Sequence, residues 1–111
     1  MQRTQPIRVA VIVPIYYRPE LYLTIQRCLN DLDYHYPDWN IVTIDDGSPF
    51  ECPFKTTMEN EENLGYVKTI NRGMKAVYDA GADIILVVND DLEFTEGSLD
   101  RFLKLEDNVI A

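Results

Sequence analysis

The chain has 111 residues, of which 46% are hydrophobic and 26% charged, a balance typical of one globular domain covering residues 1–111. Ten lysines and arginines stand against nineteen aspartates and glutamates. The net charge of −9 argues against nucleic acid as a partner, because basic patches drive binding to its phosphates.

No stretch approaches the ~20 apolar residues that a membrane span requires. Residues 1–6 lack the apolar core of a secretory signal. We therefore expect a cytoplasmic location and no transmembrane segment. Attachment to the inner face of a membrane would need regions outside this sequence.

The first half of the chain predicts a strand, a helix and a second strand. Residues 7–15 contain an unbroken apolar run and predict a buried strand. Pro19 suits the first turn of a helix, and a turn is expected at residues 34–38. Residues 41–44 are predicted to form the second strand. The apolar residues that recur at helical spacing between the strands are Leu21, Ile25, Cys28, Leu29 and Leu32.

The second half repeats this alternation. Residues 54–59 predict a short edge strand and residues 84–88 a third buried strand. Between them we expect a helix that ends at Gly81; its buried stripe is predicted to be Val67, Ile70, Met74, Val77 and Tyr78. Thr95 would open a last helix containing Leu99, Phe102 and Leu103, and residues 108–111 resemble the start of a further strand.

The alternation of apolar strands with amphipathic helices predicts an α/β domain with a mostly parallel sheet flanked by helices. We interpret the chain as the first part of a longer, truncated domain of this kind. Ligands of such sheets bind at the carboxyl ends of the strands. Three polar clusters follow the three main strands and should meet there: residues 16–18, 45–48 and 89–91.

The cluster Asn89-Asp90-Asp91 predicts a site for Mg²⁺ or Mn²⁺, which prefer oxygen ligands. A cation there could bridge a diphosphate and neutralise its charge. The alternative is an acidic turn whose side chains cap the backbone.

The cluster after the second strand offers Asp45 and Asp46 as acceptors for a base N–H or for ribose hydroxyls. Gly47 would allow a sharp turn. The alternative is an Asx turn between strand and loop. Tyr16, after the first strand, would stack on a nucleobase or else pack under the sheet edge.

Asn63-Leu64-Gly65 frames the start of the middle helix, whose amino end could face a phosphate. Arg18, Lys68 and Arg72 are candidate partners of a diphosphate, or else solvated surface charges. Gly73 lies inside the helix, where glycine is unfavourable, and we expect a packing reason for it.

In this order the motifs resemble those of the family 2 glycosyltransferases of the GT-A fold, a Rossmann-like α/β architecture. The resemblance covers about residues 9–105. It implies a nucleotide-diphospho-sugar-binding domain. The matching motifs are residues 11–16, 18–21, 36–38, 45–48, 63–65, 71–73 and 89–91.

The resemblance also implies roles. Tyr16 matches the aromatic residue beside a uracil-type base, and Asp46 matches the aspartate that reads this base. Asp91 matches the metal-binding end of the family's Asp-x-Asp motif and Asp90 its middle. Asn89 stands where many members carry aspartate, whereas rhamnosyltransferase-like members have asparagine there; it would assist the metal. The full nucleotide-sugar set is Pro14, Tyr16, Arg18, Asp45, Asp46, Gly65, Lys68, Asn71 and Asp90.

Such enzymes transfer a sugar from a nucleotide diphosphate donor, here UDP- or dTDP-sugar, to a hydroxyl of a saccharide, lipid or protein, usually with inversion and with Mn²⁺ or Mg²⁺. The carboxylate base of the family lies downstream of the Asp-x-Asp motif. No residue of this sequence matches it.

Two other readings stay open. A nucleotidyltransferase also combines an α/β sheet with acidic metal ligands, but its Gly-rich loop is replaced here by Pro14-Ile15-Tyr16. The second is a truncated or degenerate domain that binds nucleotide or a partner without catalysis.

Overall fold

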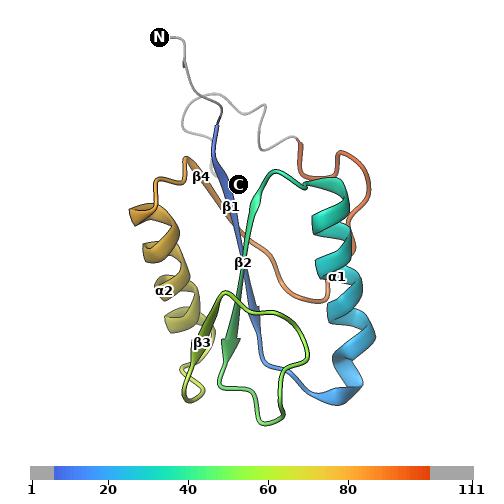
Figure 1. Ribbon diagram of the computed structural model, residues 1–111, viewed down its shortest axis with the longest axis vertical. Coiled ribbons are helices and arrows are strands. Elements are labelled where there is room, and N and C mark those ends of the chain that lie inside the picture. The colour runs from blue at the N-terminus through green and yellow to red at the C-terminus, as the bar shows by residue number, and fades with distance from the viewer. Residues whose placement is uncertain (1–6, 101–111) are drawn as a thin grey trace.

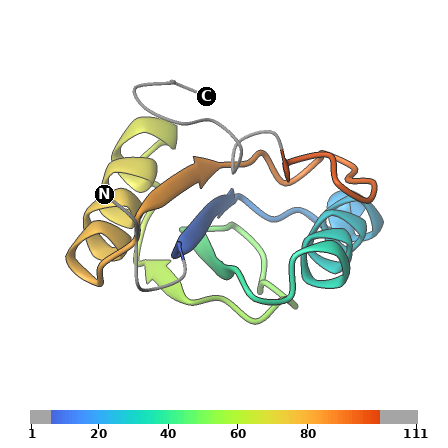
Figure 2. The same ribbon diagram turned by 90° about the horizontal axis from the view of Figure 1, so that it is seen from above.

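The computed structural model describes residues 7–100 and shows one sheet with a helix on each face (Figures 1 and 2). Four strands pair in the order β3-β2-β1-β4, and every pair is parallel. This confirms the predicted α/β class. The elements are β1 (Val9–Ile15), the 3₁₀ turn η1 (Pro19–Leu21), α1 (Tyr22–His35), β2 (Asn40–Asp46), β3 (Met58–Asn60), α2 (Tyr66–Asp79) and β4 (Ile84–Val87).

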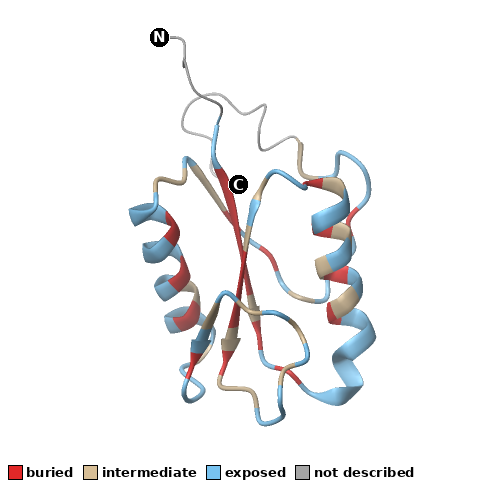
Figure 3. Cartoon of the chain, in the orientation of Figure 1, coloured by how far each residue is buried: buried red, intermediate tan, exposed pale blue. Residues whose placement is uncertain are grey.

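Strand β1 lies inside the sheet and is covered on both faces, which explains its unbroken apolar run (Figure 3). Successive side chains of a strand point to opposite faces. Val11 and Val13 therefore join the core under α1, whereas Ala10 and Ile12 join the core under α2. This alternation also decides, at the strand ends, which side each polar residue faces.

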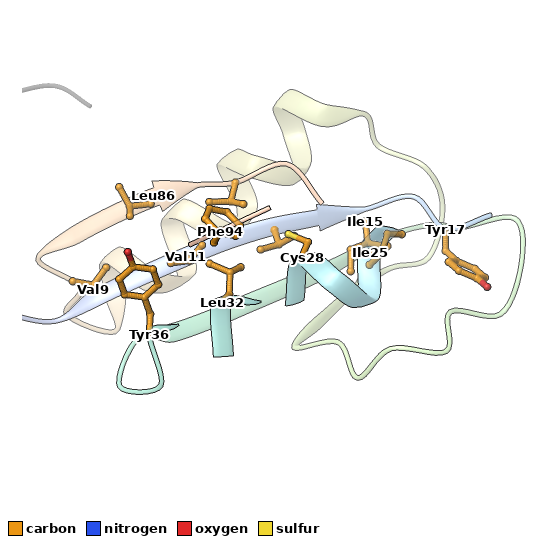
Figure 4. Close-up of a cluster of buried hydrophobic side chains, with 12 residues drawn as sticks. Val9, Val11, Ile15, Tyr17, Ile25, Cys28, Leu32, Tyr36, Leu86 and Phe94 are labelled. Carbon is orange, nitrogen blue, oxygen red and sulfur yellow. The ribbon is translucent and has the colours of Figure 1, made fainter. Parts of the chain in front are cut away.

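Helix α1 packs on the sheet through the predicted stripe (Figure 4). Ile25, Cys28 and Leu32 are buried, so the prediction of Cys28 as a core residue is confirmed. Burial raises the pKa of the Cys28 thiol to about 12, with the nearby Asp90 charge acting in the same direction. The helix continues to His35, and the turn predicted from residue 34 therefore begins later.

The predicted buried face of α2 was right at Val77 but wrong for most of the other residues. The residues that face the sheet are Thr69, Gly73 and Val77, whereas Val67 is 69% and Tyr78 72% exposed. The reason is a close approach of helix and sheet. A Cβ on Gly73 would lie 2.7 Å from Ile44 Cδ1 and 3.1 Å from Ile12 Cγ2, so a larger residue would require these side chains to shift. The packing reason expected for this glycine is confirmed.

The strand boundaries also differ from the prediction, most of all at β2 and β3. Strand β2 extends through Asp45 and Asp46, which are its last two residues rather than a loop. Strand β3 begins only at Met58. Phe54, predicted to open that strand, instead packs against the rings of Tyr17 and Tyr22, with centroid separations of 5.9 and 5.4 Å.

Most of the predicted last helix and the predicted strand at residues 108–111 lie outside the described residues. Residues 96–99 form a turn. No helix in the described part of the chain is long and apolar enough to cross a membrane.

Candidate functional site

The carboxyl ends of β1, β2 and β4 border one open pocket of about 440 Å³. Because the strands are parallel, their following segments meet at this edge of the sheet. The three predicted polar clusters thus converge, each through at least one residue. The residues that line the pocket are Pro14, Ile15, Tyr16, Leu21, Asp46, Asn63, Gly65, Tyr66, Asn89, Asp90 and Asp91.

The segment after β1 supplies the apolar wall of the pocket. Tyr16 is 41% exposed and lines the pocket, whereas its neighbour Tyr17 is buried against Phe54. The two tyrosines separate because adjacent residues of an extended chain point to opposite sides. The Arg18 guanidinium lies 5.9 Å from the centre of the Tyr16 ring, within cation–π range. Tyr16 therefore presents a half-open aromatic ring at the pocket wall.

The segment after β4 is held in place from α1. The Cys28 thiol lies 3.5 Å from the Asn89 carbonyl oxygen, to which it donates. The Phe94 N–H donates to Asp31 Oδ2 at 3.2 Å, and the Phe94 side chain is buried in the core. These contacts fix both ends of a short acidic loop and leave its middle open to solvent.

Within that loop the three polar side chains differ. Asp91 is exposed, and its carboxylate has no hydrogen bond or ion pair with any residue between 7 and 100. Asp90 is half-buried; burial raises the pKa of its carboxyl, and the charge of Asp91 raises it further. Asn89 Oδ1 accepts a hydrogen bond of 3.1 Å from the hydroxyl of Tyr66, the first residue of α2.

Oxygen atoms are the only ligands that this loop offers to a cation. Among residues 7–100, no group of three or more histidine, cysteine, aspartate or glutamate side chains is arranged to hold a metal ion. Mg²⁺ commonly binds through one or two carboxylates and completes its shell with water and substrate phosphates. Asp91 with Asn89 therefore fits a cation that arrives with a phosphate ligand, and does not fit a closed structural metal site.

Asp46 also borders the pocket, but its carboxylate is bound by the protein. Oδ1 accepts from the Asn60 amide at 3.0 Å and from Leu64 N–H at 2.8 Å. Oδ2 accepts from the Asn63 amide and from Gly65 N–H, both at 3.2 Å. Gly65 has a φ of +91°, a conformation that favours glycine and places its N–H beside this carboxylate.

The hydrogen bonds decide the ionisation of Asp46. Burial by itself would raise the pKa of its carboxyl. Donors from Leu64, Asn60, Thr69 and Gly65 outweigh this effect, and the pKa lies below the usual value. The group is therefore a stable carboxylate at neutral pH.

Asp45 faces the other side of the sheet, as the alternation within β2 requires. Its Oδ1 accepts from Ser48 N–H at 3.0 Å and from the Ser48 hydroxyl at 2.5 Å. That hydroxyl in turn accepts from Tyr17 N–H at 2.7 Å. Asp45 thus forms the Asx turn that was the alternative interpretation, and it lines a separate hollow with Ser48 and Phe54.

Several predicted site residues lie outside the pocket. Lys68 and Asn71 are exposed on α2 and are absent from its lining, as is Arg18. Arg72 points to β3, where its guanidinium donates to the Glu59 carbonyl oxygen at 2.9 Å and to Asn60 Oδ1. The structure therefore brings together only part of the predicted set: Pro14, Tyr16, Asp46, Gly65, Asn89, Asp90 and Asp91.

The pocket also contains residues that the sequence did not predict to contact a ligand. Leu21 was predicted as core but is 36% exposed and lines the pocket. Tyr66 and the Asn63 side chain belong to the wall as well. Their position beside Gly65, at the start of a helix that follows a strand, is the sequence signal that could have identified them.

Comparison with known proteins agrees with this geometry. The chain matches the family model described as Glycosyl transferase family 2 over residues 10–108. A comparison with curated proteins gives no match. The family match covers all three strand-end clusters and favours a glycosyltransferase over a nucleotidyltransferase. The chain belongs to glycosyl transferase family 2.

Proposed function

We propose that the pocket binds a nucleoside diphosphate sugar together with a divalent cation, as the donor site of a sugar-transfer reaction. The observation that carries the proposal is the convergence of an aromatic ring, a helix amino end and an open carboxylate on one pocket: Tyr16, Gly65 and Asp91. The volume of the pocket, about 440 Å³, is within the range of small-molecule sites.

The nucleobase would lie against Tyr16. Its half-exposed ring offers a flat apolar face, and Leu21 and Ile15 extend the apolar wall. Stacking on an aromatic ring is worth about 1–3 kcal/mol for a base. We propose uracil or thymine as this base, which gives UDP- or dTDP-sugar as the donor.

The diphosphate would lie near the amino end of α2. The amino end of a helix carries partial positive charge and backbone N–H groups without helical partners, of which the Gly65 N–H already donates to Asp46. Gly65 and Tyr66, at this end of the 14-residue helix, both line the pocket. The exposed cations Arg18 and Lys68 stand outside the lining and are proposed to pair with the outer phosphate oxygens.

Asp91 and Asn89 would hold Mg²⁺ or Mn²⁺, with Asp90 beside them. A bound cation supplies neutralisation of the charge that develops on the departing diphosphate. Asp91 suits this task because its carboxylate is exposed and unpaired among the described residues. The chain would contribute donor binding and leaving-group stabilisation to an inverting transfer onto an acceptor hydroxyl.

Isothermal titration calorimetry of the 111-residue chain with UDP and dTDP tests the proposal. We expect binding in the presence of Mg²⁺ or Mn²⁺ and weaker binding in EDTA. Absence of heat with both nucleotides and both metals, in a sample shown to be folded by circular dichroism, would exclude donor binding by this chain.

A further inference from the structure

Asp46 has no acceptor position left for a ligand. A carboxylate offers about four lone-pair sites. Two backbone N–H groups and the amides of Asn60 and Asn63 occupy them, and the Thr69 hydroxyl is a further donor beside the carboxylate. The residue is also 5% exposed. Contact between Asp46 and a nucleobase would therefore require the loss of an existing hydrogen bond.

Asp46 fixes the orientation of the side chain of Asn63, a residue of the pocket wall. Its Nδ2 donates to Asp46 Oδ2 at 3.2 Å and to the Asp46 carbonyl oxygen at 3.1 Å. Both partners are acceptors, so the amide nitrogen and not the oxygen must face them. With both N–H groups used, the Asn63 side chain can offer a ligand only its oxygen, Oδ1.

The backbone around Asn63 is fixed independently of the ligand. The turn at Gly47 packs directly on it: a Cβ at Gly47 would lie 2.3 Å from Asn63 N, and its φ is +62°. Asn60, which shares the Asp46 carboxylate, also donates to the buried Thr69 hydroxyl at 3.0 Å. The acceptor Oδ1 is thus attached to a rigid, preorganised element, as a group that discriminates between ligands requires.

We infer that Asn63, oriented by Asp46, selects nucleobases that present a ring N–H to the pocket. The imide N3–H of uracil or thymine can donate to Asn63 Oδ1, whereas N3 of cytosine is an acceptor and would face it unpaired. This inference rests on the proposed function and makes Asn63 the base-reading residue, with Asp46 as its positioning residue.

The test is the ratio of the affinities for UDP and CDP, each with Mg²⁺, in the wild type and in Asn63→Ala. One mispaired polar group in a pocket corresponds to about tenfold or more in affinity. We expect the wild type to favour UDP by at least about tenfold and Asn63→Ala to reduce the ratio to near one. Asn30→Ala, an exposed asparagine on α1, serves as the matched control and should keep the wild-type ratio.

The variant Asp46→Asn distinguishes a positioning role of Asp46 from direct reading of the base by Asp46. If Asp46 acts through Asn63, both Asp46→Asn and Asn63→Ala reduce the ratio. If Asp46 reads the base itself, Asp46→Asn changes the ratio and a folded Asn63→Ala keeps it, which overturns the inference. Equal wild-type affinity for UDP and CDP also overturns it. Failure of the wild type to bind either nucleotide instead contradicts the proposed function on which it rests.

Discussion

Two pairs of aspartates lie at the ends of the strands on either side of β1, and the two pairs differ in their hydrogen bonds and exposure. At the end of β2, the carboxylates of Asp45 and Asp46 accept six hydrogen bonds from protein donors. After β4, Asp91 is exposed and makes none with residues 7–100. The first pair binds the loops of the site, whereas Asp91 of the second pair stays open to solvent.

The difference follows from backbone position. Asp45 and Asp46 still belong to β2, so their side chains point to opposite faces of the sheet and meet the loops packed there. Asp90 and Asp91 lie beyond β4, in a loop fixed at its ends by Cys28 and Asp31. Residue type alone therefore does not distinguish a carboxylate that binds neighbouring loops from one that stays open to solvent.

The largest expected difference between the pairs is in stability. Asp46→Ala should lower the free energy of unfolding by about 3 kcal/mol, because it leaves several buried donors without an acceptor. Asp91→Ala, on the surface, should change it by less than about 0.5 kcal/mol. Urea denaturation followed by circular dichroism measures both variants. Equal losses in the two variants would remove the distinction between the pairs.

Ligand binding should show the opposite order. Asp91→Ala should weaken the Mg²⁺-dependent binding of UDP by about tenfold or more, since it removes the exposed carboxylate proposed to hold the cation. Binding in EDTA should change little. Asp38→Ala, an exposed aspartate between α1 and β2, makes the same charge change away from the pocket and is the control. The assignment fails if both variants respond alike in calorimetry.

Ser48→Ala tests the structural role of Asp45 with a smaller effect. The substitution removes the hydroxyl that links Asp45 to Tyr17 N–H. We expect a loss of about 1 kcal/mol in unfolding free energy, the usual contribution of a hydrogen bond. The ratio of UDP to CDP affinity should stay at the wild-type value; a changed ratio would show that Asp45 contributes to base selection.

The pH dependence of stability should report Asp46. Its folded-state pKa is lowered, so its contribution is fully present above the unfolded value of about 3.9 and is lost as the pH falls through the folded-state pKa. Thermal melts at pH 6 to pH 3 should therefore show a steeper decline for the wild type than for Asp46→Asn. Parallel declines would mean that this carboxylate is not stabilised by folding.

The sequence predicted the convergence of the clusters because it depends only on strand order along the chain. Tyr16 and Asp91 follow apolar runs, and the parallel arrangement brings them to one edge. The same reasoning could not predict which residues donate hydrogen bonds to Asp46. They lie 14 to 19 residues away in sequence, and only the packing of β3 and α2 brings them to it.

Most of the buried face of α2 was missed for a related reason, although Val77 was predicted correctly. Periodicity favours large apolar residues such as Val67 and Tyr78, which are in fact exposed. The helix instead contacts the sheet closely at Gly73, where a side chain would crowd Ile12 and Ile44. A close approach of this kind depends on the facing strands and is invisible in the helix sequence alone.

Mapping of backbone amide shifts by ¹⁵N NMR, with UDP and Mg²⁺ added to the 111-residue chain, tests the central claim most directly. The account predicts shifts concentrated at Tyr16, Asn63, Gly65 and Tyr66 and at residues 89–91. Exchange of Mg²⁺ for paramagnetic Mn²⁺ should broaden the signals of residues 89–91 most strongly. Perturbations centred elsewhere in the chain, or none in a folded sample, would contradict the account.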